Sequence, residues 1–576
     1  MHVQEYFLFM VSNHSSTFSS SYYSIRMFLS IISPFHKIGY GSTFVKQSIT
    51  RRATPEQLEH DSLIMGPREQ EGTTLSDQDE VKRKETKELP PLVNAIKTSV
   101  KKNSAPFHFQ GHKRGMTAPS SLVDVIGIGP FLHDATELPE LDRYGYPTGP
   151  LLEAQKMAAD LFGASQTWFI VCGTTCGILA AIMSTCSPGD TLILARNSHV
   201  SATSAMVLCG ALPKYILPEY NLQWDTAGGV TPSQVKIAIA ELEQEGKKAA
   251  GVFITSPTYN GVCSNISEIS QICHSHGIPL IVDEAHGSHF QFHPNMPKTA
   301  LSQGADLVIQ STHKVLCSFS QSSMLHLSGD RIDRDRVHKC LQSLQTTSPN
   351  LLLLASLDAT RDELSKNPNT LFNEVMELVQ QVKELINHIP GVLLLDLSCF
   401  SNNFSFMDPL RMTIGVQELG LSGLEAYNIL STSHGIEPEL IGTQSFTLAF
   451  SLGTNKEHTQ RLVSGLKYLS INFLQEEREI IKIDHGTDRV PFGEVYMSCT
   501  PREAFFAKKK KVNFEKCIGE VCGEFICPFP PGIPMLIPGE IITKRAMDYL
   551  IQVKDKGAFL KGAADPLLST VVVCDF

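Results

Sequence analysis

The sequence predicts an α/β fold, with a mostly parallel seven-stranded sheet in a large domain and smaller α+β structure after it. From about residue 90, short apolar runs alternate with helix-like segments, which is the pattern of an α/β domain. The apolar runs are almost continuous in Val, Ile and Leu, as is typical of parallel strands covered by helices on both faces. Later strand patterns flank a helix and indicate the α+β region.

The first part of the 576-residue chain differs in composition from the rest. Residues 1–54 are rich in serine and threonine, and Glu5 is their only acidic residue. This composition, without a compact apolar core, predicts an organelle transit peptide. The excess of serine over arginine favours the chloroplast, with a mitochondrial or cytoplasmic location and a disordered tail as alternatives. Residues 55–88 are polar and highly charged, and we expect them to form a linker.

Composition also bears on several classes of partner. The net charge of -10 argues against nonspecific binding of nucleic acid, and no apolar run approaches the roughly 18 residues needed to span a membrane. The 14 cysteines lack the spacing of a zinc site, so we expect reduced thiols and no metal. Lys508–Lys511 is the only dense basic run, which we expect to be a solvated loop or helix face.

Seven apolar runs are expected to form the sheet of a major domain over residues 89–395. They are WFIVCG (168–173), TLILAR (191–196), LPKYIL (212–217), GVFITS (251–256), PLIVDEA (279–285), DLVIQS (306–311) and SSMLHL (322–327). Helical patterns lie between several of these runs, and this alternation predicts a mostly parallel sheet.

Two further regions are expected after the major domain. A long helical pattern at 371–389 leads into a small α+β domain at 396–484. Its strand patterns are 411–416 and 445–453, on either side of a helix at 422–435. Residues 485–576 are dense in Pro and Gly and form a C-terminal domain.

Glycine and hydroxyl residues follow the first predicted strand. Gly173, Thr174 and Thr175 open a helix there. Free backbone amides, side-chain hydroxyls and the positive end of the helix dipole together suit a phosphate group. An ordinary capped helix is the alternative for this pattern taken alone.

Ionisable side chains follow three other strands. Asp283 ends one buried strand, His199 lies beyond another, and Lys314 comes directly after a third. Ligands bind at the carboxyl ends of strands in open α/β sheets, so these side chains are expected to share one edge. A lysine at such a place is expected to be poorly solvated, which is costly unless it has a partner or a chemical role. His199 alone could equally be a structural histidine.

Together these groups match the requirements of pyridoxal 5'-phosphate. A lysine can form a Schiff base with its aldehyde, and an isolated carboxylate can keep its pyridine nitrogen protonated. A histidine ring can stack on the cofactor ring. The combination is more specific than any of its parts.

Several strings extend the argument beyond single residues, among them PFHFQGHKRG, HDATELPELD, VDEAHGSH, QSTHKVLCSFSQSSMLH, HGIEPEL and PFPPGIPMLIPGE. With them the chain resembles the Orn/Lys/Arg decarboxylase family of fold-type I pyridoxal phosphate enzymes, in its short biosynthetic form without an N-terminal wing domain. The resemblance implies roles for the site residues. Lys314 would be the Schiff-base lysine, Asp283 would pair with the pyridine nitrogen, and Ala285 and His199 would lie on the two ring faces. His286 would lie beside the ring near the substrate, and the phosphate would be held by Gly173, Thr174, Thr175, Ser311 and His313.

The resemblance also implies an activity, which is α-decarboxylation of arginine, lysine or ornithine to agmatine or a diamine plus carbon dioxide. Glu524 is a candidate for binding the cationic end of the substrate, with a helix-end or interface salt bridge as its alternative role. Family members are dimers with shared sites, so we expect a homodimer or a dimer of dimers in which HDATELPELD and PFPPGIP contribute to the neighbouring pocket. Gln110 and Val200 replace the family's usual proline and lysine, which puts substrate preference and rate in doubt.

Two other functions remain open at this point. One is a different fold-type I reaction, such as that of an aldolase, a desulfurase or an aminotransferase. The other is a catalytically silent paralogue with a regulatory role, against which the presence of both Lys314 and Asp283 argues.

Overall fold

The computed structural model describes residues 89–102, 104–404, 406–474, 493, 495–529, 533–555 and 557–576. The predicted transit peptide, residues 1–54, and the predicted linker, residues 55–88, lie outside the described residues.

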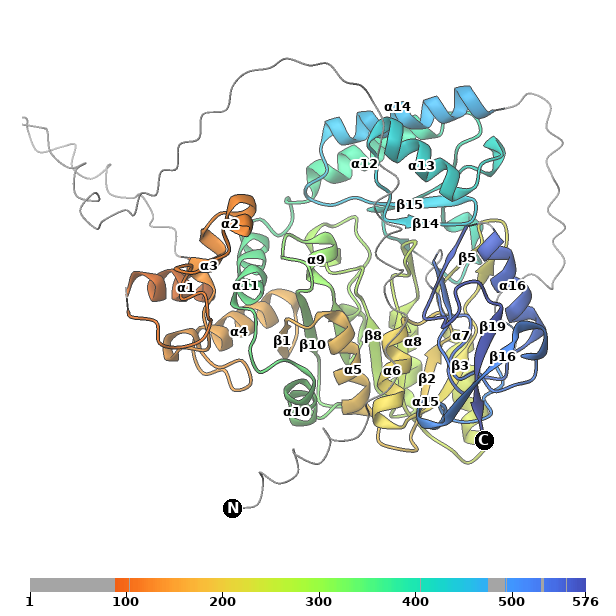
Figure 1. Cartoon of the computed structure of the whole chain (residues 1–576), viewed down its shortest axis with the longest axis horizontal. Coiled ribbons are helices and arrows are strands. Elements are labelled where there is room, and N and C mark those ends of the chain that lie inside the picture. The colour runs from red at the N-terminus through yellow and green to blue at the C-terminus, as the bar shows by residue number, and fades with distance from the viewer. Residues whose placement is uncertain are drawn as a thin grey trace, which may run out of the picture. The chain divides into compact units, whose positions relative to one another are not determined.

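A seven-stranded sheet forms the centre of the major domain (Figure 1). Its strands, in chain order, are β1 (Gln166–Ile170), β2 (Thr191–Ala195), β3 (Leu212–Ile216), β6 (Ala249–Thr255), β8 (Leu280–Asp283), β9 (Leu307–Gln310) and β10 (Ser323–Leu327). Their spatial order is β1-β10-β9-β8-β6-β2-β3. All neighbours pair in parallel except β10, which is antiparallel to both β9 and β1. The predicted strands and the mostly parallel sheet are confirmed.

Helices cover both faces of this sheet. They are α5 (Gly173–Thr185), α6 (Val200–Cys209), α7 (Pro232–Gln244), α8 (Ile266–Ser275) and α10 (Arg334–Leu344). The fully buried strand β2 shows why: Leu192 and Leu194 pack in one cluster with side chains of α5, α6 and α10. Ile193 and Ala195 point the other way and pack with α7 and α8. Successive side chains of a strand alternate between faces, so a strand that is apolar throughout needs a helix layer on each side.

An α+β lobe follows the major domain, as predicted (Figure 1). It contains an antiparallel sheet of order β11-β13-β15-β14. Its elements are α12 (Asn373–Ile386), β11 (Leu393–Leu394), β13 (Arg411–Gly415), α13 (Gly423–His434), β14 (Leu440–Ile441), β15 (Ser445–Ala449) and α14 (Lys456–Phe473). The strand pair β7 (Val262–Cys263) and β12 (Phe406–Met407) joins this region to the major domain.

The C-terminal region forms two short antiparallel pairs, β16 with β19 and β17 with β18. Its elements are α15 (Pro501–Phe506), β16 (Lys508–Asn513), β17 (Cys527–Phe529), α16 (Lys544–Asp555), β18 (Phe559–Lys561) and β19 (Thr570–Asp575). The expectation of a loop or helix face at Lys508–Lys511 is wrong, because this run lies in β16. Its lysines are solvated as expected, and the pairing with the apolar strand β19 explains the extended structure.

The remaining elements lie before the sheet, in its loops and beside it. They are α1 (Pro91–Lys101), α2 (Ser120–Ile126), α3 (Gly129–His133), α4 (Pro150–Phe162), β4 (Tyr220–Asn221), β5 (Thr226–Ala227), α9 (Thr312–Val315) and α11 (Leu351–Lys366). Helices α1, α4 and α11 contribute to one buried cluster. In the part of the chain described above, no helix is both long and apolar enough to cross a membrane.

Candidate active site

The sheet topology brings the predicted site residues to one edge. Strands β1, β2, β8 and β9 run in the same direction, so their carboxyl ends meet there. Gly173, His199 and Ser311 follow three of these strands, and Asp283 is the last residue of the fourth. The chain therefore places groups that are far apart in sequence around one locality.

Hydroxyl groups gather at the N-terminus of α5. Thr174 Oγ1 lies 2.6 Å from Ser311 Oγ and 2.8 Å from Ser323 Oγ. Gly173 begins the helix with a φ of 76°, a left-handed conformation that glycine adopts without strain. The first-turn amides of a helix have no partner within it, so this end offers N–H and O–H donors together. Such a donor set fits a phosphate group.

The turn after β9 adds two more polar side chains. His313 donates from Nδ1 to the carbonyl of Ser322 at 2.8 Å, which fixes the orientation of its ring. The hydroxyl of Thr312 is buried and has no hydrogen-bond partner among the described residues. A buried hydroxyl without a partner is uncommon in proteins, and its position beside Ser311 supports the same phosphate assignment.

Asp283 is a buried carboxylate with one hydrogen bond from the chain. It accepts from the backbone amide of Ala285 at 3.1 Å, and it is 3% exposed. Burial raises its pKa to about 6, although the cation of Lys314 acts in the opposite direction. A carboxylate in this environment would be stabilised by a protonated ring nitrogen, so the residues present fit pyridoxal 5'-phosphate at both ends.

His199 is the N-cap of α6 and is held in a fixed tautomer. Its Nδ1 accepts from the backbone amide of Ser201 at 3.3 Å, so the proton of the neutral ring is on Nε2. Burial, with the positive charges of Lys314 and Lys561, lowers its pKa to about 4. The ring is thus uncharged near neutral pH, which suits an aromatic stacking surface.

Lys314 is an exposed residue in the chain alone, while its terminal nitrogen is poorly solvated, as the sequence led us to expect. In the short helix α9, Thr312 and Val315 face the protein, and Lys314 lies on the opposite, exposed side of that turn. Its terminal nitrogen nevertheless lies 3.0 Å from Nε2 of the buried His286. Loss of hydration around this nitrogen and the charge of Arg411 lower the lysine pKa, whereas Asp283 raises it.

Sequence reasoning missed two charged residues of this locality. Arg411, the first residue of β13, donates from a terminal nitrogen to His286 Nδ1 at 3.1 Å. Glu439 acts on the pKa of both Lys314 and Arg411, raising each. Both lie in the α+β lobe rather than at a strand end of the large sheet. The available signals were an arginine opening the buried strand RMTIGV and the string HGIEPEL, which contains Glu439.

Glu524 lies in a different arrangement from the one expected for a substrate acceptor. One carboxylate oxygen accepts from the amide of Ala564 at 2.7 Å, and the other accepts from the amide of Val572 at 2.6 Å. Both oxygens are therefore used to hold neighbouring segments of the C-terminal region. This geometry gives no support to a role in binding the substrate, and it is neither of the salt bridges considered as the alternative.

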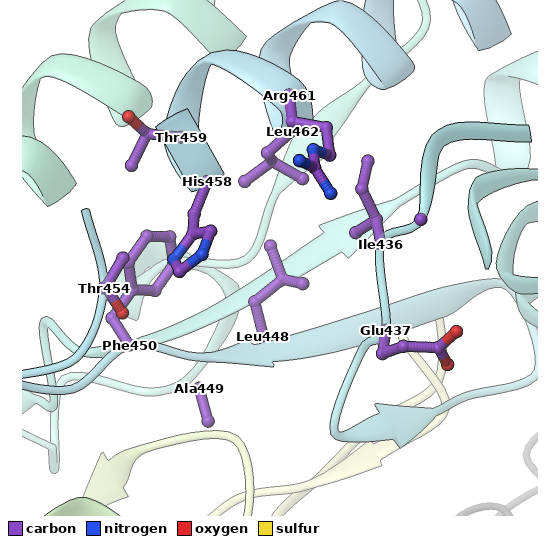
Figure 2. Close-up of a pocket in the computed structure, with 11 residues that line it drawn as sticks. Ile436, Glu437, Leu448, Ala449, Phe450, Thr454, His458, Thr459, Arg461 and Leu462 are labelled. Carbon is purple, nitrogen blue, oxygen red and sulfur yellow. The ribbon is translucent and has the colours of Figure 1, made fainter. Parts of the chain in front are cut away.

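A separate pocket lies in the α+β lobe. Figure 2 shows side chains of α14, including His458 and Leu462, facing Leu448 and Phe450 across it. Its volume is about 250 Å³. Its lining includes none of the predicted site residues, so the candidate active site is identified by chemistry at the sheet edge and not by this cavity.

Two family models match the chain. The model of the Orn/Lys/Arg decarboxylase major domain matches residues 90–399, and the model of the C-terminal domain of the same family matches residues 492–562. The first matched region contains all the residues described above at the edge of the large sheet, and Arg411 and Glu439 of the α+β lobe fall between the two matched regions.

Known relatives agree with these matches over most of their length. The chain is 33% identical to an arginine decarboxylase of Bacillus subtilis, over 84% of this chain and 97% of that protein. It is 34% identical to an arginine decarboxylase of Halalkalibacterium halodurans, over 84% of this chain and 98% of that protein. The identity to the constitutive lysine decarboxylase of Escherichia coli is 25%, over 82% and 78% of the two chains.

A solved structure shares the fold. The structure of the Escherichia coli constitutive lysine decarboxylase superposes with a TM-score of 0.71 at 24% identity, covering 84% of this chain and 82% of that one. At this identity the likeness establishes the architecture and leaves the choice of substrate to other evidence.

Proposed function

The chain belongs to the Orn/Lys/Arg decarboxylase family, whose members depend on pyridoxal 5'-phosphate, and on that premise we propose that it decarboxylates arginine to agmatine. The observation that carries the proposal is the convergence of Lys314, Asp283 and the α5 hydroxyl cluster on one sheet edge. Arginine is chosen over lysine and ornithine because two relatives, at 33% and 34% identity, are named arginine decarboxylases, whereas the lysine decarboxylase reported above is 25% identical.

Each residue has a role that follows from its chemistry. The hydroxyls of Thr174 and Ser311, with the free amides of α5, would hold the phosphate of the cofactor. Asp283 would keep the pyridine nitrogen protonated, because a buried carboxylate gains most from a nearby positive charge. Ala285 and the uncharged ring of His199 would face the two sides of the cofactor ring. Gly173, Thr175 and His313 would complete the phosphate end.

The bound cofactor supplies a ring that accepts the electron pair left on the substrate when carbon dioxide leaves. Lys314 would bind the cofactor aldehyde in the resting enzyme and yield its place to the substrate amine. His286, whose Nε2 lies 3.0 Å from Lys314 Nζ, is placed to return a proton to the substrate α-carbon. The substrate guanidinium would need a planar acceptor, which the residues described above do not identify.

Carbon dioxide release tests this function directly. The purified full chain, loaded with the cofactor, is assayed with arginine, lysine and ornithine at equal concentration. We expect release from arginine at a rate at least about tenfold above the others, since a planar guanidinium site discriminates against an ammonium. Faster release from lysine or ornithine would show that this amino acid, and not arginine, is the preferred substrate. Transamination or carbon-carbon cleavage without release of carbon dioxide would show that the chain catalyses that reaction instead of decarboxylation.

A matched pair of variants separates catalysis from cofactor retention. Lys314→Ala should abolish carbon dioxide release and the absorbance of the lysine-bound cofactor. Thr175→Ser keeps a hydroxyl at an exposed position of the same helix and should retain both. Full activity of Lys314→Ala would contradict the assignment of the lysine.

A further inference from the structure

A chain of two hydrogen bonds links the α+β lobe to Lys314. Arg411 contacts His286 Nδ1 at 3.1 Å, and His286 Nε2 contacts Lys314 Nζ at 3.0 Å. Arg411 and His286 are 4% and 7% exposed, so bulk water has little access to the first of these bonds. The ring of Tyr259 meets the imidazole edge to face, with 5.0 Å between ring centres, and restricts its rotation.

The donors in this chain determine which nitrogen of His286 carries the proton. A guanidinium group has only N–H donors, so Arg411 must donate and Nδ1 must accept with its lone pair. A neutral imidazole that accepts at Nδ1 carries its proton on Nε2. An imidazolium is excluded by the same contact, because it would set an N–H of the ring against an N–H of Arg411.

The second bond then fixes the state of the lysine. With the proton on Nε2, His286 donates toward Lys314, and an amine nitrogen can accept only when it is neutral, since an ammonium has three donors and no acceptor. We propose that Arg411 is a positioning residue that holds His286 in its Nε2–H tautomer and thereby keeps Lys314 as a neutral amine. A neutral amine is the form that can bond a carbonyl carbon, because its lone pair needs only to leave the hydrogen bond to His286, whereas an ammonium must first lose a proton.

The charged groups around Lys314 have opposite effects on its protonation. The hydrogen bond from His286 can therefore determine whether the lysine is an ammonium or a neutral amine. Arg411 disfavours a second cation at this place, whereas Asp283 and Glu439 favour the ammonium. His199, His286 and His313 are the titratable neighbours of the lysine, and burial lowers the pKa of each, which leaves them uncharged near neutral pH. Asp283 and Glu439 favour the ammonium, whereas the N–H of His286 favours the neutral amine because it needs a lone pair to accept its hydrogen bond.

The protein is built to hold Arg411 in this position. Its charge lies near Asp408, which is itself hydrogen bonded to the buried His289 at 3.0 Å. Gly261 has a φ of 93°, and a Cβ there would lie 2.9 Å from the Cβ of Arg411. A side chain at Gly261 would therefore push Arg411 away from His286, while Asp408 offsets part of the cost of burying the guanidinium.

The test measures the nucleophilicity of Lys314 without turnover. The full chain, freed of cofactor and checked for its fold by circular dichroism, is treated with limiting acetic anhydride over a pH series. Acetylation of Lys314 is quantified by mass spectrometry against the exposed Lys236 as internal standard. We expect Arg411→Met and His286→Phe each to slow acetylation of Lys314 about five- to tenfold near neutral pH, the effect of losing one hydrogen bond.

The double variant discriminates the proposed chain from simple electrostatics. If Arg411 acts through His286, Arg411→Met combined with His286→Phe should be no slower than either single variant. The proposal would be overturned if the loss of acetylation rate in the double variant were the product of the two single losses. It would also be overturned if the single variants were acetylated at the wild-type rate. Lys383→Met is the matched control, because Lys383 is a cation on the same cavity as Arg411 and Asp408 and has no contact with His286 among the described residues; its profile should not change.

The positioning role of Arg411 rests on the proposed role of Lys314 in cofactor binding. The acetylation experiment and the carbon dioxide assay test these two roles separately. Acetylation requires neither cofactor nor substrate. A chain that releases no carbon dioxide but shows the predicted dependence on Arg411 and His286 would reject the function and keep the positioning role. A chain that releases carbon dioxide but whose acetylation does not depend on Arg411 and His286 would keep the function and reject the positioning role.

Discussion

The buried carboxylate of Asp283 lowers the stability of the cofactor-free protein near neutral pH. The unfolded chain releases its aspartate protons near pH 3.9, whereas burial raises the pKa of Asp283 to about 6 in the folded chain. Between these values the unfolded state binds fewer protons, so stability falls as pH rises. We expect cofactor-free Asp283→Asn to be more stable than wild type by up to about 3 kcal/mol at pH 7, with the difference vanishing below about pH 4. Urea denaturation at the two pH values measures it.

Adding pyridoxal 5'-phosphate provides the control for this expectation. A cationic pyridine nitrogen would compensate the buried carboxylate, so the cofactor should stabilise the wild type and stabilise Asp283→Asn much less. Equal stability of the two cofactor-free proteins at pH 7 would contradict the burial argument. Equal stabilisation by the cofactor would contradict the ring-nitrogen assignment.

The site residues also show what a sequence can and cannot predict. Asp283 and the residues after β1 and β9 were predictable, because parallel strands bring their carboxyl ends to one edge whatever the loops do. The side of the turn α9 that carries Lys314 was not, since a single turn is too short for a periodic pattern to determine it. Arg411 was missed because its contact with His286 depends on how the α+β lobe packs, which no local pattern encodes.

At the scale of elements, Arg196 joins the end of β2 to the C-terminal region. It donates to the carbonyl of Met535 at 3.0 Å and to Glu540 at 2.9 Å, and both charged side chains are buried. Removing one partner of a buried ion pair leaves the other charge uncompensated, at a cost of about 3–5 kcal/mol. We therefore expect Arg196→Met to lower the thermal denaturation midpoint strongly, and Arg196→Met with Glu540→Met to recover part of the loss. Differential scanning calorimetry measures both.

An exposed ion pair of the same region is the control for this experiment. Lys544 and Asp548 lie 2.8 Å apart on the surface of α16, where water and salt screen the interaction. Lys544→Met should leave the midpoint unchanged. If the double variant at 196 and 540 were no more stable than Arg196→Met alone, the uncompensated charge would not be the cause of the loss.

The secondary structure was largely predictable where local pattern and packing agree, as in all seven strands of the main sheet. The run Lys508–Lys511 shows where they diverge. Lysine is a weak strand former, and nothing in these residues predicts extension. Their partner β19, with the sequence TVVVCD, supplies apolar side chains that need a neighbouring strand, so the structure of β16 is determined by residues about sixty positions later.

At the scale of the whole molecule, we propose that residues 1–54 direct the chain to the chloroplast. The support is their composition, and the family match begins only at residue 90. Isolated plastids should take up the full chain and not a chain lacking residues 1–54. Uptake of both to the same extent would reject the proposal, and uptake of the full chain by mitochondria alone would reassign the organelle.

We also propose that the chain is a homodimer with shared active sites. Exposed apolar side chains of the single chain gather between residues 107 and 128, where Phe107 is 95% exposed and Phe109 is 82% exposed. Large exposed apolar side chains gathered in this way commonly mark an interface. In the single chain the segment HDATELPELD contacts its own neighbours, as in the bond from Ser99 to Glu140. Glu137 accepts from the backbone amide of Tyr144 at 2.6 Å through one carboxylate oxygen, and its side chain is exposed, so a second copy can reach it.

Complementation between two inactive variants tests this arrangement. Lys314→Ala removes the lysine of a site, and Glu137→Ala removes a residue that the partner would contribute to it. In a mixed dimer both changes fall in one site and leave the other intact, so co-expressed and doubly tagged chains should recover activity at about half the sites of each mixed dimer. Light scattering should give about twice the chain mass of 63.4 kDa. Glu137→Ala with normal activity would remove that segment from the site, whereas inactive mixed dimers would show that each site is formed within a single chain.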